Sequence, residues 1–104
     1  ISRWDVSNVV DMSRMFYGAL GFNNDLQEWD VSSVTDMSFM FAFAKVFNGD
    51  ISNWDVSRVE AMSAMFMGAV SFKGVVSGWD WSRVPDMDQM FSGAGSLSSS
   101  TSIP

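Results

Sequence analysis

The chain has 104 residues with neither Cys nor His, and 12 acidic against 6 basic residues give it a formal net charge of −6. An apolar content of 47% is typical of one folded domain rather than a disordered chain, and the negative charge argues against nucleic acid as a partner. Because the chain lacks His, Cys and any apolar run long enough to cross a bilayer, we expect no enzyme, no cofactor or metal site and no membrane insertion.

A repeat of 25 residues runs through the whole chain. The stretch Trp4-Asp5-Val6-Ser7 returns at 29–32, at 54–57 and, with Trp81 in place of Val, at 79–82. A fixed period of this length is typical of repeat architectures. We therefore predict a single domain of four repeats, 1–25, 26–50, 51–75 and 76–100, with 101–104 as a tail or the start of a linker.

One short helix per repeat is predicted from the spacing of the apolar residues. Val9, Met12, Met15, Phe16 and Ala19 follow at steps of three, three, one and three, which matches one stripe of a helix. The same residue types recur at these positions in the later repeats, so we expect them to form the core. The glycines placed to end these helices are Gly18, Gly68 and Gly93.

A very short strand is predicted in the other half of each repeat. Asn and Asp residues there precede one branched apolar residue, so strands centred on Ile1, Leu26, Ile51 and Val76 are expected. Since a single repeat buries too little apolar surface to fold alone, the repeats must stack on one another. The predicted fold is an α/β, leucine-rich-repeat-like solenoid of four 25-residue coils, each with a short parallel strand and a short helix.

Three stretches carry a family resemblance: 29–38, Met40-Phe41 and 47–52. They resemble the repeat of the BspA-like leucine-rich repeat surface proteins, and the resemblance covers all four repeats, most weakly the fourth. It implies a leucine-rich-repeat-like solenoid on secreted or cell-surface proteins, with roles in adhesion and protein contact. It implies no catalytic residue and no cofactor, and it is the basis for expecting an extracellular or cell-surface location.

Two ladders of repeated residues have both a structural and a functional interpretation. The aspartates Asp5, Asp30, Asp55 and Asp80 are expected to cap turns through the following backbone N–H groups, with calcium binding as the alternative. The tryptophans are expected to be packing residues, with an exposed carbohydrate platform as the alternative. The Met and Phe residues are expected in the core, although they could also line an adaptable groove.

Positions that differ between repeats are expected to face solvent and to include any binding surface. Several apolar residues occupy positions where neighbouring repeats have small or polar residues, and exposed apolar groups that gather mark interaction sites. The alternative is partial burial under loops. The candidate interaction surface consists of Tyr17, Phe39, Phe43, Met67, Arg58 and Arg83.

The leading functional hypothesis is a non-catalytic extracellular or cell-surface module that presents a rigid face for adhesion or protein–protein interaction. The alternative is a structural subunit of a filament or large assembly, in which copies stack through uncapped solenoid ends. A glycosidase that uses carboxylates alone is the third and weakest hypothesis. The expected partners are other proteins or further copies of the chain, and no small-molecule ligand is expected.

Overall fold

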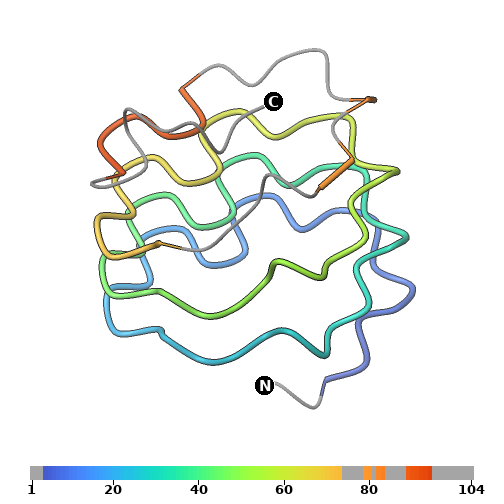
Figure 1. Ribbon diagram of the computed structural model, residues 1–104, viewed down its shortest axis with the longest axis horizontal. Helices are drawn as coiled ribbons and strands as arrows, with labels where there is room; N and C mark the ends of the chain where they lie inside the picture. Colours follow the sequence, from blue (N-terminus) through green and yellow to red (C-terminus); the bar gives the residue numbers. More distant parts are fainter. Residues whose placement is uncertain (1–3, 74–78, 81, 84–88, 95–104) are drawn as a thin grey trace.

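Stretches of chain that are 25 residues apart lie side by side in the computed structural model (Figure 1). The structure describes residues 4–73, 79–80, 82–83 and 89–94. We call each repeat's length of chain a layer: 4–25, 26–50, 51–73 and the described parts of the fourth repeat. The principal extents are 32 × 30 × 20 Å, so the layers form a compact globule.

The predicted α/β, leucine-rich-repeat-like solenoid is wrong. The described residues contain no helix, and their strand pairing is limited to two isolated parallel bridges, Asp11 with Asp36 and Asp36 with Ala61. Leu26 and Ile51, two of the predicted strand centres, are fully buried but belong to no strand. The other two, Ile1 and Val76, lie outside the described residues.

The stretch predicted as a helix is a run of tight turns, because its N–H groups have two kinds of partner. The N–H groups of Met15 and Tyr17 donate three residues back along the chain, to carbonyls at 3.2 and 3.1 Å. The N–H groups that alternate with them, on Arg14 and Phe16, donate instead to the second layer, at 3.0 and 2.9 Å. An α-helix would direct every one of these groups four residues back, so pairing between layers replaces the helix.

A left-handed residue in each layer also excludes a helix. Arg14, Phe39, Ala64 and Gln89 occupy the same position of the repeat and have φ values of 59°, 59°, 54° and 58°. Non-glycine residues adopt this region infrequently, and it cannot be part of a right-handed helix. The glycines predicted to end helices, Gly18, Gly68 and Gly93, also have positive φ but lie in further turns.

Single peptide units link three layers. The unit between residues 38 and 39 accepts at the Ser38 carbonyl from the Arg14 N–H and donates from the Phe39 N–H to Ser63, both at 3.0 Å. The units 40–41 and 42–43 make the same pair of contacts. Successive units therefore form columns of hydrogen bonds across the layers, and they hold the layers in one register.

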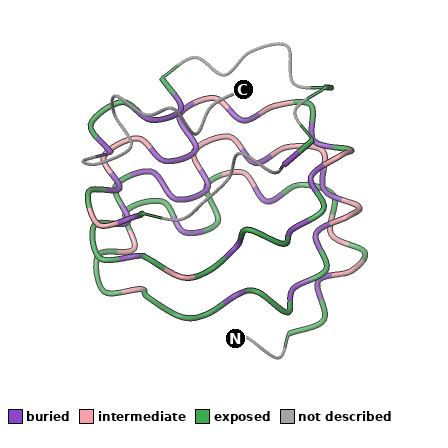
Figure 2. Cartoon of the chain, viewed as in Figure 1, coloured by how far each residue is buried: buried purple, intermediate pink, exposed green. Residues whose placement is uncertain are grey.

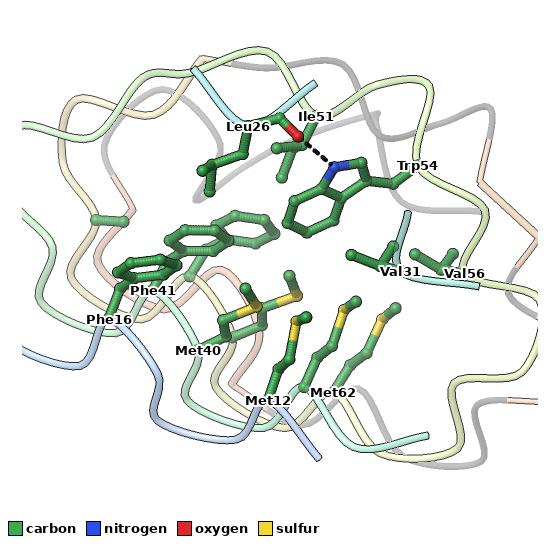
Figure 3. Packing of buried hydrophobic residues seen from close by; sticks show 14 of the residues in the cluster. Met12, Phe16, Leu26, Val31, Met40, Phe41, Ile51, Trp54, Val56 and Met62 are labelled. Atoms are coloured by element: carbon green, nitrogen blue, oxygen red, sulfur yellow. Dashed lines mark hydrogen bonds between the residues drawn. The ribbon is translucent and has the colours of Figure 1, made fainter. Parts of the chain in front are cut away.

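Most residues that the apolar spacing selects lie in the core, as predicted, although Met15 of the first layer is exposed. Phe16, Phe41, Phe66 and Phe91 form a stack with ring centroids 5.5, 5.7 and 5.6 Å apart. Figure 3 shows the first two of these rings together with rows of methionines from successive layers. The Trp54 indole Nε1 donates to the Leu26 carbonyl of the preceding layer at 3.0 Å (Figure 3).

The two ends of the stack of layers differ in exposure. Trp4 is 58% exposed and Met15 is 38% exposed in the first layer, whereas Trp29 and Met40 in the second are 4% and 0% exposed. In the last layer the equivalent residues Trp79 and Met90 are 4% and 2% exposed. Figure 2 shows exposed residues along much of the first layer and buried ones through the layers between the ends. The first layer therefore leaves core residues uncovered.

Candidate functional site

Three of the predicted interaction residues gather on one edge of the structure. The Tyr17 ring lies 5.7 Å from the Phe43 ring, edge to face, and 6.2 Å from the Phe39 ring. Tyr17 and Phe43 are 49% and 38% exposed, and Phe39 is half-buried. The Arg14 guanidinium lies 5.1 Å from the centre of the Phe39 ring, a cation–π contact. We call Tyr17, Phe39 and Phe43 the aromatic patch.

The backbone at Phe43 is held in a conformation that suits glycine. Its φ is 59°, and the equivalent positions of the other layers are Gly18, Gly68 and Gly93, with φ of 66°, 68° and 69°. A side chain in the left-handed region costs about 1–2 kcal/mol per residue. The second layer therefore has an exposed aromatic ring where each other layer has the residue best suited to the backbone. Such a departure motivates a functional hypothesis.

The Phe43 ring lies directly over Gly68 of the third layer. A Cβ at Gly68 would come within 2.6 Å of the Phe43 Cδ1 and 2.9 Å of its Cε1, so a side chain there would displace the ring. The neighbouring residue Met67 is half-buried, and its carbonyl accepts the Phe43 N–H at 2.7 Å. Met67 therefore borders the aromatic patch without contributing a further exposed ring.

The two predicted arginines lie elsewhere. Arg58 and Arg83 are exposed. The positive charge of Arg58 lowers the pKa of Asp55, and that of Arg83 lowers the pKa of Asp80, but hydrogen bonds from serines lower both pKa values more. The arginine that contacts an aromatic ring is Arg14, which we did not select from the sequence. The sequence could have indicated Arg14, because its position has different residue types in the four repeats, which was the criterion for the residues that we did select.

The aspartate ladder caps turns, as expected. The Ser N–H two residues on donates to the carboxylate at 3.1 Å for Asp5 and at 3.0 Å for Asp30, Asp55 and Asp80. These bonds and the bonds from the serine hydroxyls lower the pKa of all four carboxyls. Within the described ranges, no group of three or more His, Cys, Asp or Glu residues is placed to hold a metal ion.

The tryptophans Trp29, Trp54 and Trp79 are buried packing residues, as expected, so the alternative of an exposed carbohydrate platform does not form across these layers. One expectation about exposure is wrong. Ala42 and Ala64 vary between repeats, but both are buried. Variation between repeats therefore does not by itself show that a residue is exposed.

Residues 1–103 match the family model described as Mycoplasma protein of unknown function, DUF285. The chain belongs to this family. No curated protein and no solved structure matches the DUF285 chain. Its assignment to the BspA-like leucine-rich repeat surface proteins is therefore wrong. The descriptions of the chain as a leucine-rich repeat protein and a solenoid are wrong too, because the described residues contain no helix and no regular strand. That described part also lacks any helix long and apolar enough to cross a membrane.

Proposed function

We propose that the chain is a non-catalytic protein-contact module and that its docking surface is the aromatic patch. The observation that carries the proposal is Phe43, which is 38% exposed with a φ of 59° at a position occupied by Gly in the three other layers. Backbone preference does not explain an aromatic side chain at this place, and packing on Gly68 and Tyr17 leaves the ring partly exposed. Recognition of a partner explains it.

The neighbouring contacts support the same role. Tyr17 packs edge-on against Phe43, and Arg14 covers one face of Phe39. Aromatic residues and Arg are enriched in the parts of interfaces that contribute most to affinity. The hydrogen-bonded columns beneath the patch fix its backbone, so little ordering would be needed on binding.

The partner proposed for the patch is a protein segment with an apolar or aromatic anchor flanked by basic residues. The anchor suits the exposed rings of Tyr17 and Phe43. Basic flanks suit a chain whose formal net charge is −6, because complementary charge favours encounter and orientation. An extracellular or cell-surface location stays a prediction, since its basis was the family resemblance that the DUF285 match replaces.

The test is a selection of random displayed peptides on the immobilised chain, followed by affinity measurements on variants. Phe43→Gly restores the residue type of the other layers and removes the anchor. We expect it to weaken the selected peptides tenfold or more, which corresponds to about 1.4 kcal/mol. Val10→Ser is the matched control, because Val10 is an exposed apolar residue outside the patch, and it should leave their affinity unchanged.

Two results would count against the proposal. One is a selection that yields no binder. The other is a set of peptides whose affinity for Phe43→Gly equals that for the unmodified chain. Circular dichroism of each variant would verify that the fold is retained.

The alternative role, a structural subunit of a filament or large assembly, concerns the ends of the stack of layers and not the aromatic patch. It stays a prediction.

A further inference from the structure

Exposed aliphatic residues gather close to the aromatic patch in the sequence of each layer. Leu20, Val46 and Val70 are 60%, 44% and 51% exposed. They occupy positions 20 and 21 of the repeat, two or three residues after the position of Phe43. Val46 and Val70 belong to layers that each have a neighbouring layer on both sides, so their exposure does not come from an open end of the stack. We call Leu20, Val46 and Val70 the aliphatic strip.

The charges around the strip differ in sign from the net charge of the chain. The part of each repeat that carries the patch and the strip has no acidic residue in the first three layers; it spans 12–24, 37–49 and 62–73. Its charged residues are the exposed bases Arg14, Lys45 and Lys73. Lys45 occupies the same position of the repeat as Leu20 and Val70, in the layer between them, and makes no ion pair within the described part of the chain. The strip is therefore an apolar row with a cation at its centre.

The spacing of the layers matches the pitch of an α-helix. The rings of Phe22, Phe47 and Phe72, which follow the strip within two residues in each layer, lie 5.6 and 5.7 Å apart from one layer to the next. An α-helix rises about 5.4 Å per turn, whereas residues on one face of a strand are roughly 6.6 Å apart. A helix that runs along the stacking direction can therefore place one side chain per turn over each successive layer.

We propose that the docking surface takes an amphipathic helix of another protein, with an acidic residue facing Lys45 and an apolar residue one turn away on each side, facing Leu20 and Val70. The expected pattern is an apolar residue, an acid roughly three or four positions later, and a second apolar residue about seven positions after the first. This inference rests on the proposed function, because the same partner segment supplies the anchor for the aromatic patch. The basic flanks of that segment lie outside the apolar stretch.

Charge and fold favour this occupant over two others. An anionic lipid surface attracts basic segments, but it would also meet the acidic remainder of a chain with a formal net charge of −6. A helix covers the acid-free part alone, and its carboxylate gains from the cation at the centre of the strip. A second copy of the chain has no helix to offer from its described residues. The partner is therefore a different protein.

Synthetic copies of the displayed peptides that bind the chain provide the first test, which concerns the apolar contacts. Val70→Ser removes one apolar residue of the strip, and we expect it to weaken the peptides about fivefold or more. Val10→Ser is a closely matched control, because Val10 is 53% exposed and Val70 is 51% exposed. Val10 lies outside both the patch and the strip, so its variant should leave the affinity unchanged.

An exchange of charges tests the contact at Lys45. Lys45→Glu should weaken the peptides about tenfold, because it sets two carboxylates against each other. A peptide whose acidic residue is replaced by Lys should bind this variant within about threefold of the original affinity. Arg58→Glu makes the same change in net charge beside Asp55, away from the patch, and should not weaken the peptides.

Circular dichroism of the mixture tests the helix itself. The described residues contain no helix, so we expect the helical signal of the bound peptide to exceed the sum of the free components. Binding without this gain, or unchanged affinity for Val70→Ser or Lys45→Glu, would overturn the inference, whereas the aromatic patch would stand as long as Phe43→Gly weakens the peptides. A selection without binders would overturn both, as would binding confined to anionic phospholipid vesicles.

Discussion

Replacing Gly68 with Ala should destabilise the chain more than the same change at Gly18, and the difference measures the contact beneath the aromatic patch. Both glycines have left-handed backbones, with φ of 68° and 66°. A Cβ at Gly18 would meet nothing within 4 Å, whereas one at Gly68 would lie 2.6 Å from the Phe43 Cδ1. The two substitutions therefore share the backbone cost and differ in the steric cost.

The magnitudes follow from these two contributions. A left-handed alanine costs about 1–2 kcal/mol, which is the whole expectation for Gly18→Ala. Overlap with a packed side chain adds roughly 1–3 kcal/mol. Gly68→Ala should therefore lower the free energy of unfolding by about 2–5 kcal/mol, a large share of the roughly 5–15 kcal/mol typical of a domain.

Urea denaturation followed by circular dichroism gives both values, and a double-mutant cycle assigns the difference. In the Phe43→Gly background the ring is absent, so Gly68→Ala should cost no more than Gly18→Ala does in the unmodified chain. Equal costs for the two alanine substitutions in the unmodified chain would refute the close contact between Phe43 and Gly68. A cost at Gly68 that persists after removal of the ring would also refute it.

Two further predictions concern the core and the turns. Trp54→Phe should lower the free energy of unfolding by about 1–2 kcal/mol, since it loses a buried hydrogen bond to the Leu26 carbonyl and leaves a small cavity. Trp4→Phe at the exposed end should lower it by less than about 0.5 kcal/mol. Equal losses of stability in thermal or urea unfolding would contradict this. The pKa of Asp30 is lowered by hydrogen bonds from Ser32. Its stabilising effect is therefore present above the unfolded-state pKa, which is about 3.9 for an ordinary Asp, and is lost as pH falls through the lower folded-state pKa. Asp30→Asn should weaken the loss of stability between neutral pH and pH about 3 in thermal melts, and an unchanged pH dependence would contradict that assignment.

The sequence predicted which side chains face the interior but not the backbone that places them there. Met12, Phe16 and their equivalents among the described residues are buried as the apolar spacing indicated. That spacing reports the direction of side chains, and a run of turns satisfies it as well as a helix does. The conformation was decided by left-handed residues such as Arg14 and Ala64, whose residue types give no signal for a positive φ.

Part of the candidate site was also readable from the sequence. Tyr17, Phe39 and Phe43 departed from the small or polar residues of neighbouring repeats, and the structure brings them together. Arg58 was selected by the same criterion but lies beside an aspartate instead. Comparison of the repeats shows that a residue type differs from its equivalents. It does not show what the side chain contacts, because the contacts depend on which turn of the layer the residue occupies.

The columns of peptide units also have an electrical consequence. Units such as 38–39 and 40–41 all point their N–H groups toward the last layer and their carbonyls toward the first. Their dipoles therefore add along the stacking direction, as the peptide dipoles of an α-helix add along its axis. These columns therefore have a dipole, negative at the Ser13 end and positive at the Gly93 end, which is partly offset by the Thr35 and Glu60 N–H groups that donate toward the first layer. The Arg14 side chain belongs to the layer at the negative end, where a cation is favoured.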